Sequence, residues 1–187
     1  LLTYPLGRGQ ILLGKFVGHG LILALATVLG FGCAMLAIAL LVDDVDFAML
    51  LWAFGRFMLT SALLGWCFLG MAYGLSSLCA EKSTAAGLAL GVWFYFVLVF
   101  DLALLALLVL SKGQFNPQGL PWLLLLNPTD VYRLINLSGF GTGTQSVGVM
   151  ALGSDLDVPP LALWACLLGW VAVPLALAYG LFRRRAA

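Results

Sequence analysis

The most regular feature of the chain is a series of four long apolar stretches separated by more polar segments. They cover residues 16–42, 57–79, 85–110 and 161–182, and each is long enough to cross a hydrocarbon core of about 30 Å as a helix, which takes about 20 residues. Lipid offers no partners to backbone N–H and C=O groups, so such stretches must be helical. The pattern predicts an all-α polytopic membrane protein with four spans, and residues 47–55 indicate an interfacial helix before the second span.

The segment between the third and fourth spans, residues 111–160, is too long and too varied to be a simple turn. Residues 120–126 are apolar but far too few to cross a bilayer, so they predict a short re-entrant or interfacial helix. The pair Asn127 and Pro128 is typical of a helix start, with the amide as N-cap and the proline at the first helical position. We expect this second short helix to end at about Leu137.

Composition agrees with a membrane location. Apolar residues make up 63% of the 187 positions and charged residues only 9%, which leaves too little polar surface for a water-soluble globule. The net charge of +1 does not indicate binding to nucleic acid. We expect a single transmembrane domain over residues 1–187, and because the chain begins at Leu1 rather than at Met, we expect that it lacks an N-terminal part.

Basic residues indicate which side faces the cytoplasm, because Lys and Arg are enriched in cytoplasmic loops. If the four helices alternate in direction, then Arg8, Lys15, Lys82 and residues 183–185 share one side of the membrane. The opposite side collects six aspartates and two basic residues: Asp43, Asp44, Asp46, Asp130, Asp155, Asp157, Lys112 and Arg133. We therefore expect both ends of the chain to be cytoplasmic.

Two charged residues lie inside the predicted second and third spans. Asp101 is placed where an unpaired carboxylate is costly, and Arg56 enters the second span from the same side of the membrane. We predict a structural role for Asp101, either in an ion pair with Arg56 or as a neutral acid beside a snorkelling Arg56. The alternative is a substrate pathway, because intramembrane carboxylates often mark one.

The sequence offers no catalytic or metal-binding set. Gly9, Gly14 and Lys15 nearly match a phosphate-binding loop, but Phe16 follows where Ser or Thr must hold Mg²⁺. The four cysteines lack the paired spacing of a zinc site or a disulfide framework. We therefore expect no enzyme activity and no cofactor in this chain.

Glycines four residues apart occur twice around the turn between the second and third spans. The pairs are Gly70 with Gly74 and Gly87 with Gly91, and this spacing lets helix backbones approach closely. We predict a tight hairpin of these two spans. The alternative is that glycine is simply common in membrane helices.

The order of elements in residues 120–148 suggests a docking surface. A short apolar helix is followed by a capped helix and then by a Gly-rich strip. We predict that this segment forms an outer platform for a partner protein, with Asn127, Asp130, Tyr132 and Arg133 as the residues that carry it. The alternative is a lid that closes the outer end of the protein.

Two stretches resemble those of ABC-2 type permeases. The opening LLTYPLGRGQILLGKF is similar to the segment that follows the ATPase-contacting helix of these proteins, and LLLLNPTDVYRL is similar to the Leu-Asn-Pro segment of their re-entrant outer region. The resemblance implies a transmembrane domain like that of type V exporters. In that arrangement Leu2, Thr3, Pro5 and Arg8 are expected to contact the ATPase subunit, because they form a basic, turn-containing cytoplasmic segment before a span.

Within that family, the chain is similar along its length to permease subunits of transporters that mature nitrous-oxide reductase. This likeness implies a homodimer in a bacterial inner membrane, six spans per subunit, and a cytoplasmic ATPase pair that binds ATP and Mg²⁺. It also implies a periplasmic copper-handling partner, and a role in assembling copper sites either by transport of copper or a sulfur species or by a mechanical relay. An ABC-2 exporter of a lipid or hydrophobic drug is the alternative.

Overall fold

The computed structural model describes residues 7–44, 46–111, 120–137 and 158–184, and all of its regular elements are helices. Four helical stretches are long and apolar enough to cross a membrane: Gly9–Leu41, Phe47–Leu78, Lys82–Leu110 and Pro160–Phe182. The prediction of an all-α polytopic fold with four spans is therefore confirmed for the described part of the chain.

The first two spans are single long helices. Helix α1 covers Arg8–Leu41 and α2 covers Phe47–Leu78. Asp46 caps α2, because its carboxylate accepts from the backbone N–H groups of Ala48 and Met49 at 3.0 and 3.2 Å. The predicted separate interfacial helix is wrong: residues 47–55 form the first turns of α2 itself, since the cap starts the helix there and nothing after it breaks the backbone ladder.

The third span is interrupted by a π-helical segment. Helix α3 (Lys82–Phe94) passes into the π-helix η1 (Tyr95–Val99), which continues as α4 (Phe100–Leu110). The N–H of Phe100 accordingly bonds the carbonyl of Tyr95, five residues back. A π-helical turn disturbs the regular ladder of a helix, so its carbonyls can be reached by side chains from neighbouring elements.

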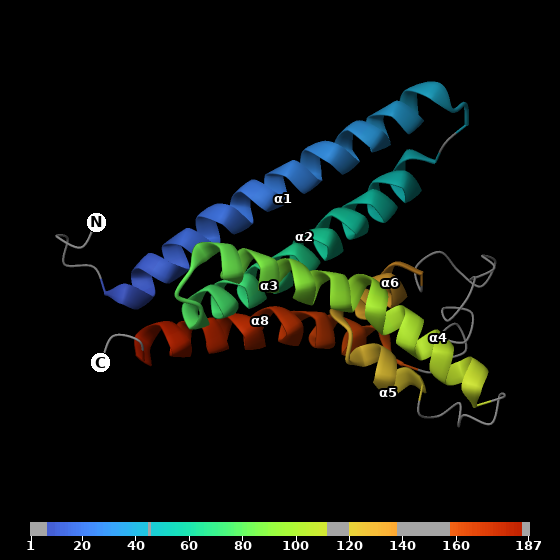
Figure 1. Cartoon of the computed structure of the whole chain (residues 1–187). Coiled ribbons are helices and arrows are strands. Elements are labelled where there is room, and N and C mark those ends of the chain that lie inside the picture. The colour runs from blue at the N-terminus through green and yellow to red at the C-terminus, as the bar shows by residue number, and fades with distance from the viewer. Residues whose placement is uncertain (1–6, 45, 112–119, 138–157, 185–187) are drawn as a thin grey trace.

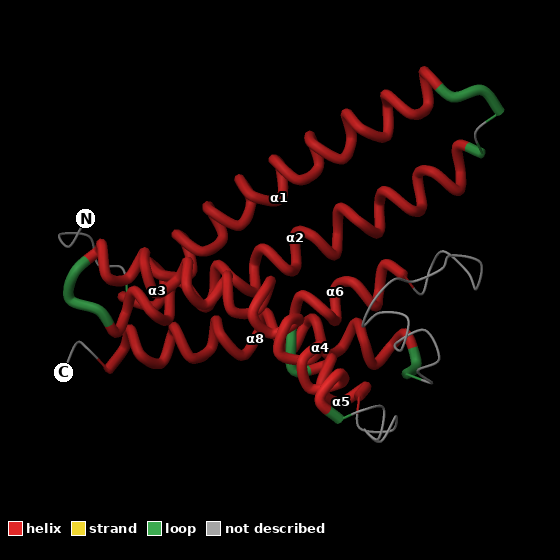
Figure 2. Tube along the Cα trace, turned by 45° about the vertical axis from the view of Figure 1, so that its right-hand side comes forward, coloured by secondary structure: helices red, strands yellow, loops and turns green. Residues whose placement is uncertain are grey.

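The remaining helices are α5 (Leu120–Leu125), α6 (Pro128–Leu137) and the fourth span, α8 (Pro160–Arg184). The start of α1, the turn between α2 and α3, and the end of α8 lie at the same end of the bundle (Figures 1 and 2). The two short helices lie towards the opposite end, beside α4 and the start of α8. The described core gathers around them and consists of Leu63, Leu104, Leu124, Val131, Leu134, Ile135, Leu163 and Leu167.

The glycines of α2 pack against α8 and not against α3. A Cβ added at Gly70 would lie 3.3 Å from the backbone nitrogen of Leu175, and one at Gly74 would lie 3.9 Å from the Cβ of Ala178. Atoms added at Gly87 and Gly91 would meet nothing within 4 Å. The predicted glycine-mediated hairpin of the second and third spans is therefore wrong, because the close approach is made with the fourth span.

Candidate functional site

Helix α6 begins as its sequence predicts. The side-chain oxygen of Asn127 accepts from the backbone N–H of Thr129 at 3.0 Å, and the Asn127 carbonyl accepts from the N–H of Val131 at 3.1 Å. Pro128 follows at the first helical position, where no N–H is needed. The expected N-cap is confirmed, and α6 is described as far as Leu137.

Asn127 also connects α6 to the π-helical segment of the third span. Its Nδ2 donates to the carbonyl of Phe96 in η1 at 2.9 Å and to Asp130 Oδ2 at 3.0 Å. The residue is fully buried, at 0% exposure. One amide therefore caps α6, holds the first acidic side chain of that helix, and bonds the third span where its backbone ladder is disturbed.

Arg133 lies between two carboxylates. Its Nη1 donates to Asp101 Oδ2 in α4 and, at 3.1 Å, to Asp130 Oδ1 one turn earlier on α6. Asp101 is thus paired with Arg133 and not, as predicted, with Arg56. The prediction considered only the spans as sources of a cation, whereas α6 inserts its own arginine beside α4.

Asp130 is almost completely buried, with 1% of its side chain exposed. Burial, and to a lesser extent the nearby charge of Asp101, raise the pKa of Asp130, while Arg133 and the bond from Asn127 lower it, and the net result is a pKa of about 7. Asp130 shares the guanidinium of Arg133 with Asp101, and its burial favours the protonated form of its own carboxyl group.

The second half of α6 is bonded to α2. The Nδ2 of Asn136 donates to Thr60 Oγ1 at 3.0 Å, and the Asn136 carbonyl accepts from Arg56 Nη2 at 2.9 Å. Ser61 donates to the hydroxyl of Tyr132 at 3.2 Å. The guanidinium of Arg56 also lies over the ring of Trp52, at 4.5 Å from its centroid.

These bonds define what we call the α6 network. Its polar side chains from α6 are Asn127, Asp130, Tyr132, Arg133 and Asn136, and its partners in the spans are Arg56, Thr60, Ser61, Phe96 and Asp101. The fourth span joins the same region, since Trp170 Nε1 donates to the carbonyl of Leu125 at 3.0 Å. The segment from α5 to α6 is thereby bonded to the second, third and fourth spans.

The residues predicted to carry the outer platform are all in this network. Asn127 and Asp130 are buried, so they anchor α6 within the bundle, whereas Tyr132 and Arg133 are only partly covered. Sequence reasoning missed Asn136, Thr60 and Ser61. A signal was present, because Asn127, Asp130, Arg133 and Asn136 recur every three residues, a spacing that makes each a neighbour of the next and carries the row of polar side chains gradually around the helix.

Of the four expected ATPase contacts, only Arg8 belongs to a described element, and the start of α1 lies at the end of the bundle opposite α6 (Figure 1). Leu2, Thr3 and Pro5 lie outside the described residues, and of Arg8 the structure describes the backbone alone, as the first residue of α1. At that end of the bundle α1 and α2 are joined by polar contacts: His19 Nδ1 lies 2.7 Å from the hydroxyl of Tyr73. In the described residues no group of three or more His, Cys, Asp or Glu side chains is placed to hold a metal ion.

Comparison with known proteins places this arrangement in a family. The sequence model described as ABC-2 family transporter protein matches residues 1–187. A protein of Stutzerimonas stutzeri named "Probable ABC transporter permease protein NosY" is 72% identical over 185 residues, which cover 99% of this chain and 67% of that protein. A protein of the same name from Pseudomonas aeruginosa is 67% identical over 185 residues, with the same coverage of both chains.

Proposed function

The chain belongs to the ABC-2 family of transporter proteins, and from that membership we propose that it couples ATP hydrolysis in a separate subunit to the maturation of the copper sites of nitrous-oxide reductase. The observation that carries the proposal is the identity of 72% and 67% to two proteins named as NosY permeases. The permease is a membrane protein, with four apolar helices in the part of the chain that the structure describes, and it is not itself the ATPase. Its partners in this proposal are a second copy of the chain, a cytoplasmic ATPase dimer that binds ATP and Mg²⁺, and a periplasmic copper-handling protein.

Two mechanisms are compatible with this role. In the first, copper or a sulfur species crosses the membrane. In the second, the permease relays ATPase motion to the periplasmic partner without conducting a substrate. The α6 network supports the relay, because Asn127, Arg133 and Asn136 bond one short helix to the second and third spans, so a movement of these spans displaces α6 with them.

The experiment that separates these mechanisms is ATP hydrolysis by the full complex reconstituted in lipid. Under the relay, the copper-handling partner stimulates hydrolysis, and added sulfur compounds or lipids do not. Stimulation by sulfur compounds in the absence of the partner supports transport. Stimulation by a lipid or hydrophobic drug alone contradicts both and indicates the exporter alternative.

The basic residues support a proposal for which end of the helix bundle faces the cytoplasm. We place the end of the bundle that contains the start of α1, the turn before Lys82 and the end of α8 in the cytoplasm, with Leu2, Thr3, Pro5 and Arg8 beside the ATPase. Support comes from the arrangement in Figure 1, which brings these three parts of the chain to one end. Cysteines placed at Thr3 and Arg8 should cross-link to the ATPase, and cross-links from Asp46 instead would mean that the topology is inverted.

The outer platform is tested by binding of the periplasmic partner. Replacing Tyr132 and Arg133 by Ala should weaken this binding while assembly with the ATPase persists. The same double variant also removes bonds to Ser61 and Asp101, so the matched control is Ser61→Ala with Asp101→Asn, which loosens the same bonds from the spans. If the control weakens partner binding equally, the loss comes from the loosened attachment of α6 and not from direct contacts of Tyr132 and Arg133. If neither variant weakens partner binding, α6 is a lid and not a platform.

A further inference from the structure

The side of the third span that is covered by the rest of the chain changes position at η1. The residues that are at least partly covered are Ala85, Ala89 and Val92 in α3, and Phe100, Asp101, Leu104 and Leu108 in α4. A regular α-helix turns by about 100° per residue, so Leu104 would lie about 100° around an uninterrupted helix from Ala85. This angle is the turn of one residue. The two covered sides therefore line up only if η1 takes in one extra residue.

The π-helical hydrogen bond supplies this extra residue. The N–H of Phe100 bonds the carbonyl of Tyr95, five residues back, whereas in an α-helix it would bond the carbonyl of Phe96. The turn closed by the longer bond contains one more residue, so α4 is rotated relative to a continuation of α3. This rotation directs Asp101 towards Arg133 and places Leu104 in the core.

Helix α6 contacts η1 and the turn that follows it. Asn127 Nδ2 donates at 2.9 Å to the carbonyl of Phe96, which is the acceptor that Phe100 would need in the α-helical form. Arg133 bonds Asp101, which faces α6 because of the rotation at η1. Two side chains of one short helix therefore both favour the π-helical form of the third span.

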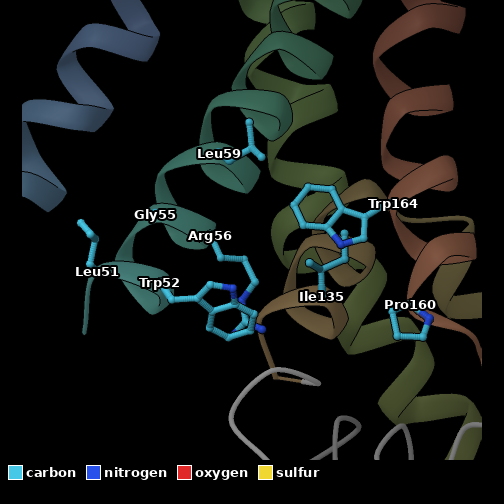
Figure 3. A pocket seen from close by; sticks show the side chains of 8 residues that line it. All are labelled: Leu51, Trp52, Gly55, Arg56, Leu59, Ile135, Pro160 and Trp164. Atoms are coloured by element: carbon cyan, nitrogen blue, oxygen red, sulfur yellow. The ribbon is translucent and has the colours of Figure 1, made fainter. Parts of the chain in front are cut away.

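Both α6 and the beginning of η1 are attached to other spans. The ring of Phe96 packs edge-on against Trp170 of α8, with 5.6 Å between the ring centroids. Near the end of α6, Ile135 lines the same hollow as Arg56 of α2 and Trp164 of α8 (Figure 3), and Trp164 packs against the core that contains Ile135. A change in η1 would therefore appear as a movement of α4, and not of α3 or α6.

From these contacts we propose that η1 is a register switch in the third span, which α6 holds in the π-helical form through Asn127 and Arg133. In the other state the N–H of Phe100 bonds Phe96, and α4 turns by about 100° and advances by about 1.5 Å along its axis. Each residue of α4 then takes the place of the residue that follows it, so Phe100 replaces Asp101 beside α6. The ion pair is lost, and α4 is released from α6. The switch belongs to the third span itself and does not depend on the proposed function.

The balance between the two forms is set by side chains. The switch exchanges the bond from Phe100 to Tyr95 for one to Phe96, so this N–H has a backbone partner in both states. The α-helical form lacks the bonds from Asn127 and Arg133 and exposes Leu104, which is 5% exposed in the structure. Single π-helical turns within α-helices are frequent at functional sites, and an element with two discrete arrangements is what a switch requires.

The register can be measured by cysteine cross-linking in the full complex in lipid, with a short reagent that joins two thiols. One pair is Asp101→Cys with Arg133→Cys, and the other is Phe100→Cys with Arg133→Cys. The first pair should give the higher yield. Because both pairs lack Arg133, Asn127 alone holds η1 in this background. Asn127→Ser still caps α6 but lacks the amide that donates to Phe96, so it should change the ratio of the two yields about fivefold in favour of the second pair.

Two controls separate the switch from a general loosening of α6. Thr60→Val removes a bond between α6 and α2 but none to η1, so it should leave the ratio unchanged. Deletion of Val99 removes the extra residue, so the third span becomes a regular α-helix in which Asp101 still faces α6. The first pair should then keep the higher yield, and Asn127→Ser should no longer change the ratio.

Each other outcome overturns the inference. Equal yields from both pairs before any further change would show that η1 fixes no register. An unchanged ratio in Asn127→Ser would show that α6 does not hold η1. An equal change in Thr60→Val would assign the effect to general loosening of α6. Loss of the first cross-link on deletion of Val99 would show that η1 contains no extra residue. Should the deletion variant fail to assemble, the comparison of Asn127→Ser with Thr60→Val decides.

Discussion

Arg133 is the cation on which both carboxylates of the α6 network depend. Asp130 is 1% exposed, whereas the side chains of Asp101 and Arg133 are each 32% exposed. The network therefore lies between a buried pair, whose disruption costs about 3–5 kcal/mol, and a surface pair worth about 0–1 kcal/mol. We expect Arg133→Gln to lower the free energy of unfolding by about 2 kcal/mol.

The cost should fall when the carboxylate that loses its partner is neutralised as well. In Arg133→Gln, Asp101 is left without the cation to which it bonds, and Asp101→Asn removes that charge. The double variant should therefore lose about 1 kcal/mol less than the sum of the two single variants. Lys82→Gln is the control, because this exposed residue at the start of α3 lies outside the network and its effect should simply add to that of Arg133→Gln.

The assay is thermal unfolding of the purified full-length complex, followed by tryptophan fluorescence. For a domain of this size, 1 kcal/mol shifts Tm by about 2–4 °C, so Arg133→Gln should lower Tm by about 4–8 °C. The reasoning is refuted if Tm falls by less than about 2 °C, or if the effects of Arg133→Gln and Asp101→Asn are strictly additive.

Three further predictions use the same measurement. Asn127→Ala, which removes the α6 cap and the bond to Phe96, should cost about 2 kcal/mol, and Asn127→Ser should recover about 1 kcal/mol because serine still caps. The raised pKa of Asp130 means that the folded state retains a proton which the unfolded state releases above about pH 4, so stability should fall by about 2 kcal/mol between pH 5 and pH 7. Asp130→Asn should lack this fall, and an equal fall in the variant would assign it to other groups. Gly70→Leu should cost about 3 kcal/mol because its Cβ meets the backbone of α8, whereas Gly87→Leu, in open space, should cost less than about 0.5 kcal/mol.

Features with a local cause were predictable from the sequence. The four spans follow from the length of the apolar stretches, since lipid leaves the backbone no alternative to a helix. The start of α6 follows from Asn127 and Pro128, which supply an acceptor and a suitable φ within two adjacent residues. Neither feature depends on which other parts of the chain lie nearby.

Contacts between residues of different helices were not predictable in the same way. Asp101 had two candidate cations, Arg56 and Arg133, and spacing along the chain gives no means of deciding between them, because α6 reaches α4 only after the whole segment has folded back. The face that Gly70 turns to a neighbour was equally undetermined, since a four-residue spacing describes one helix and not its partner. The π-helical turn at residues 95–99 has no local signal, and its role becomes visible only through the bond from Asn127 to Phe96.

The position of α6 has a mechanical consequence that its length alone would not suggest. A helix of 10 residues is too short to be stable by itself, so α6 depends on the spans for its structure. Its bonds run to α2 through Asn136, to η1 through Asn127 and to α4 through Arg133. Hydrogen bonds of this kind are costly to break at a site that water does not reach. Helix α6 therefore moves together with these helices and not independently of them. If ATP hydrolysis shifts the second or third span, the segment on the α6 side of the membrane is displaced with it, and a protein bound there experiences the movement without any continuous pore.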